Sequence, residues 1–266
     1  MIDGKNSENL EKGEGFSSID FVCQCLIDED KFNAFEKVLK SVINKESNVL
    51  ELGTGSGILA MLSARLGAKK VNAVEFDPYI AKVAEENIKN NKLDEIVRVV
   101  NNDARVVKFP NEKFDVVVME MLATGLVDEM QVLAMNNLYN QGVLTDETIV
   151  VPFAQENYIA LANTNFSIYD FNMKMVRHLW SHDENEDLFK QVTEKVLLNK
   201  ICFAQVNEEV FSAKIDFTLE KDAKINSLCL TSKIIVDREV KSGEVVSINI
   251  NYKFGGGFKN FDAKFI

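Results

Sequence analysis

The hydrophobic positions between residues 48 and 119 follow two periods in turn. Nearly continuous apolar runs alternate with stretches whose apolar residues recur at helical spacing. The runs are Asn48–Leu52, Val71–Val74, Ile96–Val100 and Phe114–Met119; the stretches are Ile58–Leu66 and Pro78–Asn91, the latter with Asp77 as its N-cap. Continuous apolar runs are typical of strands buried on both faces. The alternation predicts an α/β fold with a doubly wound parallel sheet covered by helices.

The pattern changes on both sides of this region. Residues Phe16–Ile43 have mixed helical spacing and predict two short helices before the first strand. Beyond Pro152, β-strands are favoured at Asn157–Ala162, Val210–Leu219, Ile225–Val236 and Glu244–Phe254, with a turn at Gly255–Gly257 before a last strand. The charged segment Ile168–Leu198 predicts a helical insertion. We therefore divide the chain into an N-terminal domain, 1–151, and a mostly antiparallel domain, 152–266, with an insertion at about 168–198.

Composition narrows the class of protein. The 266 residues are 46% hydrophobic and 27% charged, which predicts a packed globular core. A net charge of −11 disfavours nucleic acid as a partner, because nucleic-acid binding normally needs a basic surface. The sequence has neither an apolar signal core nor a run of membrane-spanning length, so we expect a cytoplasmic protein that does not bind membranes. Four scattered cysteines predict free thiols.

A glycine-rich turn follows the first predicted strand. The turn contains Gly53, Thr54, Gly55 and Gly57, and Glu75 ends the next strand. Glycines let a backbone turn sharply and approach a ligand, and an acid at the second strand end can bind both ribose hydroxyls. The spacing differs from the dinucleotide pattern, and Glu51 adds negative charge where a pyrophosphate would be repelled. A cationic ligand without phosphates, S-adenosyl-L-methionine, is the predicted cofactor.

Acidic residues also follow the third and fourth predicted strands. Asp103, followed by Ala104, stands where an acid could bind the adenine amino group. Glu120 ends the most apolar strand, at the sheet edge where such folds bind ligands, and Glu129 follows nine positions later at the start of a predicted helix. Two carboxylates can hold a planar guanidinium through paired hydrogen bonds. Glu120 and Glu129 are therefore the candidate catalytic pair.

These motifs together resemble a class I S-adenosylmethionine-dependent methyltransferase of the protein arginine methyltransferase type. The resemblance is carried by Val49–Leu59, by Gly67–Glu75 and by the glutamates at positions 120 and 129. It implies a Rossmann-like domain followed by a β-barrel-like domain, to which Phe211–Val236 is similar. Segment 26–31 resembles the part that binds the methionine carboxylate, with Lys31 where the family carries arginine. Glu120 is also expected to contact the cofactor, and a homodimer is left open.

The expected reaction is N-methylation of a guanidinium-like, arginine-type group on a protein, peptide or small molecule. Three alternatives stay open: another small-molecule or peptide acceptor, an RNA or DNA acceptor, and a regulator that binds the cofactor without turnover. Segment Val118–Met121 lacks the Asn/Asp-Pro-Pro-aromatic motif of adenine methylation, which argues against the second, and the intact glycine turn argues against the third. His178 and His182 have a spacing that fits a solvated helix face better than a metal site, so no metal is expected.

Overall fold

The computed structural model describes residues 19–173, 189–219, 221–236, 247–251 and 262–265. Its first half contains a five-stranded parallel sheet with the order β3-β2-β1-β4-β5. The strands are β1 (Asn48–Leu52), β2 (Lys70–Glu75), β3 (Val97–Asn101), β4 (Val116–Met119) and β5 (Ile149–Val151). The first four were predicted from their apolar runs, and the parallel α/β sheet is confirmed.

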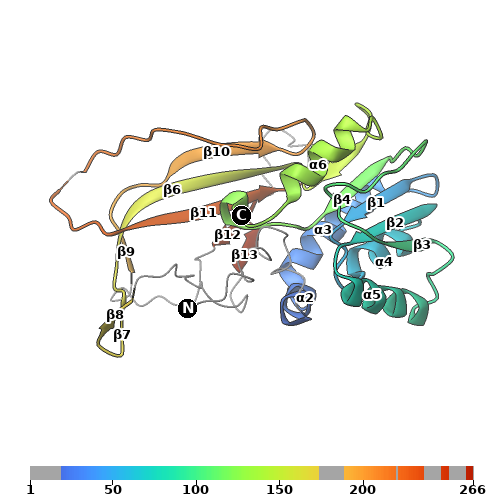
Figure 1. Ribbon diagram of the computed structural model, residues 1–266, viewed down its shortest axis with the longest axis horizontal. Coiled ribbons are helices and arrows are strands. Elements are labelled where there is room, and N and C mark those ends of the chain that lie inside the picture. The colour runs from blue at the N-terminus through green and yellow to red at the C-terminus, as the bar shows by residue number, and fades with distance from the viewer. Residues whose placement is uncertain (1–18, 174–188, 220, 237–246, 252–261, 266) are drawn as a thin grey trace.

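Helices connect these strands and cover the sheet (Figure 1). They are α2 (Ile19–Leu26), α3 (Glu29–Val42), α4 (Ile58–Arg65), α5 (Pro78–Asn90), the short 3-10 helix η2 (Thr124–Leu126) and α6 (Gln131–Asn140). Two caps begin helices near the sheet edge. Asp77 accepts hydrogen bonds from the backbone N–H groups of Tyr79 and Ile80, and Asp28 accepts one from Lys31. Such caps satisfy N–H groups that a helix start leaves unpaired.

The second half of the chain forms an antiparallel sheet that extends away from the parallel one (Figure 1). Its strands are β6 (Ala154–Thr164), β9 (Phe189–Gln191), β10 (Val196–Cys202), β11 (Ser227–Ile235), β12 (Ser247–Asn251) and β13 (Asp262–Phe265). Pairing runs in the order β10-β6-β11-β12-β13, with β9 also on β6. The antiparallel sheet is confirmed, and the described pairings do not join β10 to β13, so the described residues show no closed barrel. The long β6–β11 ladder contains no bulge, the irregularity that usually curves a sheet toward closure.

The predicted helical insertion is also corrected where it can be seen. Strands β7 (Ser167–Ile168) and β8 (Phe171–Asn172) form a hairpin, and β9 and β10 occupy the far end of the segment. Tyr169 and Asp170 join β7 to β8 with φ of 51° and 64°, the left-handed backbone that tight hairpins require. Two successive residues in the left-handed region cannot continue a right-handed helix, so the chain reverses here as a hairpin. Residues 174–188, with His178 and His182, lie outside the described residues.

The strand expected at Val210–Leu219 does not form in this described segment. The segment is extended but pairs with no described strand, and its apolar side chains Val210 and Phe211 are 80% and 52% exposed. An alternating pattern specifies a strand only where a partner completes the hydrogen bonds and covers one face.

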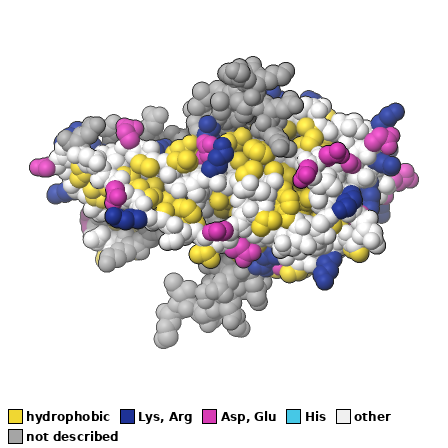
Figure 2. Space-filling view, turned by 90° about the horizontal axis from the view of Figure 1, so that it is seen from above, with side chains coloured by type: hydrophobic (Ala, Val, Ile, Leu, Met, Phe, Trp, Pro, Cys, Tyr) yellow, Lys and Arg dark blue, Asp and Glu magenta, His cyan; other side chains and the backbone are white. Residues whose placement is uncertain are grey.

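Figure 2 shows hydrophobic side chains spread over the face of the molecule that it views.

One hydrophobic core runs through both sheets. Its buried residues include Leu50, Val117 and Met119 of the parallel sheet and Phe203 and Ile234 of the antiparallel half. The two sheets therefore share a packed junction, and the loop from β4 to α6 lies beside it. Among the described residues, no helix combines the length and the apolar character needed to cross a bilayer.

Candidate active site

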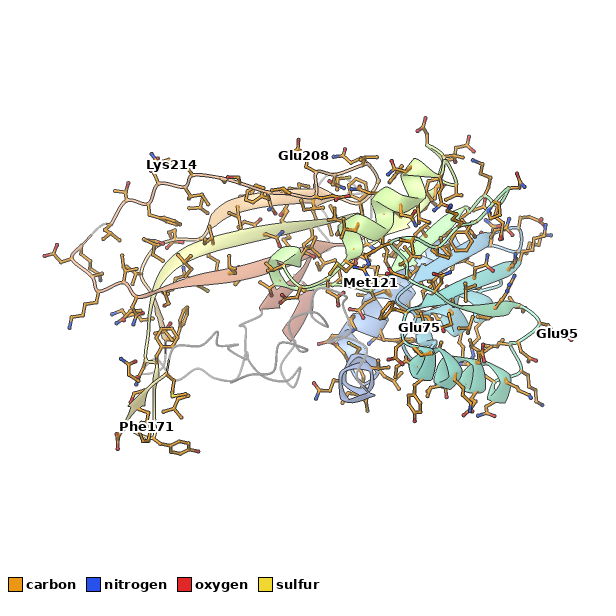
Figure 3. All side chains as sticks on the ribbon, viewed as in Figure 1. Glu75, Glu95, Met121, Phe171, Glu208 and Lys214 are labelled. Carbon is orange, nitrogen blue, oxygen red and sulfur yellow. The ribbon has the colours of Figure 1, made fainter. Side chains whose placement is uncertain are left out.

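A cavity lies at the carboxyl ends of β1, β2 and β4, and residues of helices α2 and α3 form part of its lining. This is the edge where open α/β sheets bind ligands. Figure 3 labels Glu75 on the side of the parallel sheet and Met121 on the side of the antiparallel sheet. Ten of the predicted site residues line the cavity: Lys31, Glu51, Gly53, Thr54, Gly55, Glu75, Asp103, Ala104, Glu120 and Glu129. Gly57 does not line it.

The glycine turn shapes one wall of the cavity. Gly53 and Gly55 have φ of 73° and 53°, and Gly57 begins α4 with a φ of 85°. A Cβ on Gly53 would lie 2.7 Å from the Cγ atom of Met121, so this position also needs a small residue for space. The turn thus keeps the backbone close to the cavity, as the sequence predicted, whereas Gly57 shapes the start of the helix.

Glu51 lies beneath the turn and holds it from below. Its carboxyl accepts a hydrogen bond from the Thr54 hydroxyl, and its exposed fraction is 2%. Burial raises its pKa to about 8, which the Thr54 hydrogen bond opposes and the charge of Glu75 reinforces. The Glu51 carboxyl is therefore mostly protonated at neutral pH and supports the turn by hydrogen bonding, not by the negative charge that the sequence suggested.

Glu75 is fixed by the backbone around it. One carboxylate oxygen accepts the N–H of Gly55 at 2.9 Å, and the other accepts the N–H of Asp77 at 3.0 Å. Burial raises the pKa of this carboxyl, and the backbone hydrogen bonds act in the opposite direction. The Phe76 N–H also stabilises the charged form, and the oriented carboxylate lines the cavity.

Lys31 and Glu120 form a buried ion pair across the cavity. The Lys31 Nζ and a Glu120 carboxylate oxygen are 3.3 Å apart. Burial opposes the charge on Lys31, but Glu120, Cys25 and Asp28 together outweigh burial and raise the pKa of the lysine. Burial raises the pKa of Glu120 against the pull of Lys31, and burial with the charge of Glu120 raises the pKa of the Cys25 thiol to about 12. The thiol is therefore protonated at neutral pH.

Glu129 lies just before α6 and faces the same cavity as Glu120. Burial and the negative charge of Glu120 together raise its pKa to about 8. The loop from Glu120 therefore does bring the two carboxyls close enough to interact, as their spacing suggested. Lys31 offsets part of the charge at Glu120, and Glu129 supplies a carboxyl that a cation can ionise.

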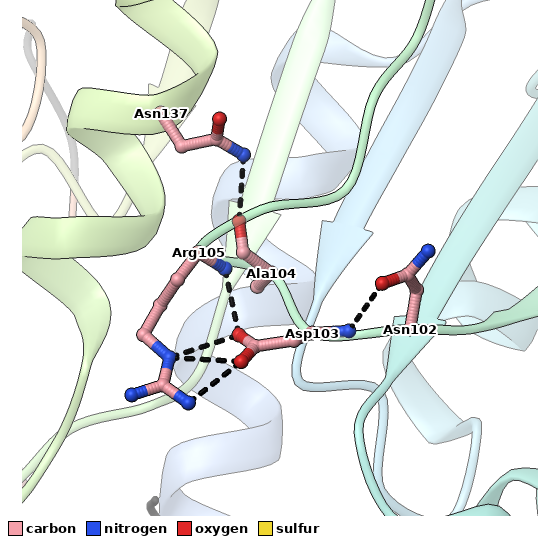
Figure 4. Close-up of polar contacts among 5 residues, drawn as sticks. All are labelled: Asn102, Asp103, Ala104, Arg105 and Asn137. Carbon is pink, nitrogen blue, oxygen red and sulfur yellow. Dashed lines mark hydrogen bonds and ion pairs between the residues drawn. The ribbon is translucent and has the colours of Figure 1, made fainter.

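Asp103 is held differently from what the sequence suggested. Both of its carboxylate oxygens accept hydrogen bonds from Arg105 (Figure 4). The shortest of them joins the Arg105 Nη2 to the Asp103 Oδ2 at 2.6 Å. Partial burial opposes its charge, but these bonds lower the pKa of Asp103. The neighbouring Ala104 is buried, and its carbonyl accepts a hydrogen bond from Asn137 of α6 (Figure 4). An adenine contact at Asp103 would have to share the carboxylate with Arg105.

The cavity also contains residues that the sequence argument missed. Cys25 and Leu26 come from α2, Arg105 follows Asp103, and Met121 and Met130 flank the loop from β4 to α6. Cys25 and Arg105 carried no motif of their own. Only their nearness in the chain to Lys31 and Asp103 could have drawn attention to them.

The chemistry of the lining fits S-adenosylmethionine. The cavity contains five carboxyl groups and two basic groups, and each basic side chain already pairs with an acid, Lys31 with Glu120 and Arg105 with Asp103. Such a lining repels a pyrophosphate and accepts a cation such as a sulfonium. Apolar walls from Phe32, Ile58 and Phe76 complete the cavity. Fold and site thus define a class I S-adenosylmethionine-dependent methyltransferase.

Comparison with known proteins gives the family. Residues 35–199 match the family model described as ribosomal protein L11 methyltransferase (PrmA). This region is more than half of the chain and includes the glycine turn, both candidate carboxyls and the first strands of the antiparallel sheet. The chain therefore belongs to the PrmA family of S-adenosylmethionine-dependent methyltransferases.

Two kinds of relative match by sequence. The uncharacterized protein MJ1452 of Methanocaldococcus jannaschii is 30% identical over 254 residues, covering 88% of this chain and 92% of the relative. The ribosomal protein L11 methyltransferase of Alkaliphilus oremlandii is 38% identical over 114 residues, covering 41% of this chain and 36% of that enzyme. The likeness to the L11 enzymes is thus confined to part of each chain, whereas MJ1452 matches nearly throughout.

Solved structures share the fold over most of the chain. The Trypanosoma brucei PRMT1 enzyme-prozyme complex with AdoHcy has a TM-score of 0.68 at 17% identity, covering 90% of this chain and 82% of that one. Arabidopsis thaliana protein arginine methyltransferase 10 has a TM-score of 0.65 at 17% identity, covering 91% of this chain and 83% of that one. The arrangement of a parallel sheet followed by an antiparallel one is therefore shared beyond the PrmA match.

Proposed function

We propose that this methyltransferase N-methylates a cationic, guanidinium-like group of the arginine type on a protein or peptide. The observation that carries the proposal is the placement of Glu120 and Glu129 in one cavity, where the charge of the first raises the pKa of the second. A cation between them would remove this repulsion. A neutral acceptor would leave it in place.

The proposed roles follow from the contacts of each residue. Glu75 would bind the ribose hydroxyls, and Gly53, Thr54 and Gly55 would hold the cofactor close to the backbone above Glu51. Lys31 would hold the methionine carboxylate, with Glu120 beside it. Asp103 and Ala104 would lie against the adenine. When bound, the cofactor supplies a methyl group activated by a sulfonium.

The two glutamates would act on the acceptor. They would hold the planar guanidinium so that one of its nitrogen atoms faces the methyl group of the cofactor. Positioning of this kind is a major source of rate enhancement. Glu129, with a pKa of about 8, is matched to accept a proton near neutral pH as the nitrogen gains its methyl group. Partial burial of both side chains strengthens these electrostatic effects.

A protein acceptor is supported by the family. Relatives in the PrmA family are named for the methylation of ribosomal protein L11, and two structural neighbours are named as arginine methyltransferases. The net charge of −11 also favours a basic protein or peptide over a nucleic acid.

The test is transfer of labelled methyl groups from S-adenosylmethionine into four separate pools: cellular proteins, peptides, free arginine and RNA. Within the peptide pool, matched peptides that differ only in arginine or lysine distinguish a guanidinium from an ammonium acceptor. We expect label in protein and in the arginine peptide. Label confined to RNA, or to the lysine peptide, would overturn the guanidinium assignment.

A further inference from the structure

The loop that carries Glu120 and Glu129 is held at its start by α6, where the Gln131 side-chain carbonyl accepts the Met121 N–H at 3.1 Å, and in its middle by the antiparallel sheet. The Gln155 side-chain amide donates a hydrogen bond to the Ala123 carbonyl at 2.9 Å. The Gly125 N–H donates to the Ser232 hydroxyl, also at 2.9 Å. Both loop positions lie between the two glutamates, so the anchors act on the middle of the loop.

The anchors belong to one buried network. Ser232 donates its hydroxyl proton to the Asn157 side-chain carbonyl at 2.6 Å, and Gln155 donates to the same oxygen at 2.8 Å. Asn157 in turn donates to Asn199 of β10. Gln155, Asn157 and Ser232 are 0%, 1% and 4% exposed. A network so completely removed from water favours one arrangement of its members, because a buried polar group that loses its last partner is costly, and the Gln155 side-chain carbonyl already has none among the described residues.

The loop needs such support. Gly125 has a φ of 71°, and its neighbour Leu126 has a φ of 53°, an uncommon conformation for a leucine. Backbone of this kind persists only where its surroundings over-determine it. The bond from the Gly125 N–H to Ser232 restrains the loop at this point.

We propose that Gln155 and Ser232 are positioning residues that fix the loop and so hold the carboxyl groups of Glu120 and Glu129 in place relative to each other. The antiparallel sheet thereby controls methyl transfer without lining the cavity. This inference rests on the proposed roles of the two glutamates in acceptor binding. The described hydrogen bonds of the anchors include neither the glycine turn nor Glu75, so we expect their loss to leave this part of the cofactor site in place.

Hydrogen exchange measured by mass spectrometry tests the anchor directly on the full-length protein. Ser232→Ala removes the acceptor of the Gly125 N–H, and Gln155→Met is a second variant that removes the donor to Ala123 at similar volume. We expect amides of residues 121–126 to exchange about tenfold faster in either variant, with residues 49–57 unchanged. Ser227→Ala is the matched control, because Ser227 lies on the same strand and pairs with Thr164 at 2.7 Å, away from the loop.

Kinetics then separates positioning from general stability. With the arginine peptide as acceptor, both variants should lose at least about tenfold in kcat/KM while the Kd for S-adenosylmethionine stays within about twofold. Unchanged loop exchange would overturn the proposal, and so would faster exchange with full turnover or equal deprotection of residues 49–57. Should the wild-type protein label only RNA, the guanidinium assignment fails. The exchange experiment and turnover on RNA then decide whether the anchors position the loop.

Discussion

The cofactor side and the acceptor side of the site are built from contacts of very different range. On the cofactor side, Glu75 is held by backbone groups 2 and 20 residues away, and Glu51 by Thr54, 3 residues away. On the acceptor side, the loop is held by Gln131 from 10 residues away, by Gln155 from 32 and by Ser232 from 107. One half is a local motif, and the other is assembled by the whole fold.

This difference in range has a functional consequence. A local motif keeps its geometry whenever the strand and helix around it are folded. A loop anchored at a distance depends on the packing of a second sheet, so its shape can change between relatives while the cofactor site stays the same. The comparison predicts that substitutions on the two sides separate cofactor affinity from turnover.

The largest effect is expected from Glu120→Gln. This change keeps the shape of the side chain but removes its charge, and we expect turnover to fall by about a thousandfold because transition-state charge in a buried site is lost. Cofactor affinity, measured by calorimetry, should stay close to wild type. The matched control is Glu156→Gln, which breaks an ion pair with Lys200 in the antiparallel sheet, outside the cavity. Comparable turnover by Glu120→Gln would remove the assigned role.

Gly53→Ala should act on the other side of the comparison. A Cβ here meets Met121 at 2.7 Å and adds strain at a φ of 73°, so the turn must shift. We expect the Kd for S-adenosylmethionine to rise by about a hundredfold, from about 1–3 kcal/mol of strain together with the lost contacts.

The control for that variant is Gly67→Ala. Gly67 has a φ of 99°, but an alanine Cβ there would have no described heavy atom within 4 Å beyond its chain neighbours, and the residue is not part of the cavity lining. It should lower the melting temperature and leave the Kd unchanged. Equal affinity losses in both variants would show that the effect of Gly53 is one of stability alone.

The same difference in range explains what the sequence could predict. The glycine turn, Glu51 and Glu75 are contiguous or end consecutive strands, so their spacing alone places them at one sheet edge. Glu120 and Glu129 could be proposed as a pair for the same reason. Nothing near Gln155 or Ser232 in the sequence indicates that they meet the loop, because that contact exists only after two sheets have packed.

Errors in the fold prediction also came from the antiparallel half. The parallel strands were predicted correctly because burial on both faces leaves a continuous apolar run. Val210–Leu219 alternates as a strand does but pairs with no described strand, and the hairpin around Tyr169 exposes its apolar side chains, with Tyr169 and Phe171 91% and 69% exposed. Periodicity reports which faces are buried, and it fails where an element is exposed on both faces.

An effect of intermediate size is expected on the acceptor side, in the pH dependence of the free energy of unfolding. Glu129 has a folded-state pKa of about 8, above the usual value of 4.5, so the folded protein keeps a proton that the unfolded chain releases. This stability is present below pH 4.5 and is lost as the pH rises toward 8. Glu129→Gln has no proton to release, so it should flatten this decline by about 1–3 kcal/mol in chemical denaturation.

Part of the decline should persist in that variant, because the Glu51 carboxyl also has a pKa of about 8. Glu95→Gln, at an exposed turn, removes one negative charge elsewhere and serves as the control. An identical pH dependence in the wild type and in Glu129→Gln would show that Glu129 is solvated and does not share the cavity with Glu120 in solution.

The smallest effect is expected from Asp77→Ala, a variant on the cofactor side that separates the free energy of unfolding from cofactor affinity. Asp77 caps α5 through the N–H groups of Tyr79 and Ile80, and its own N–H binds Glu75. Alanine keeps that N–H, so the variant should lose about 1 kcal/mol of unfolding free energy and little cofactor affinity. Asp77→Asn keeps a capping oxygen and should retain most of the stability. A large affinity loss in Asp77→Ala would mean that the cap orients Glu75, and the cofactor side would then depend on more than its nearest backbone.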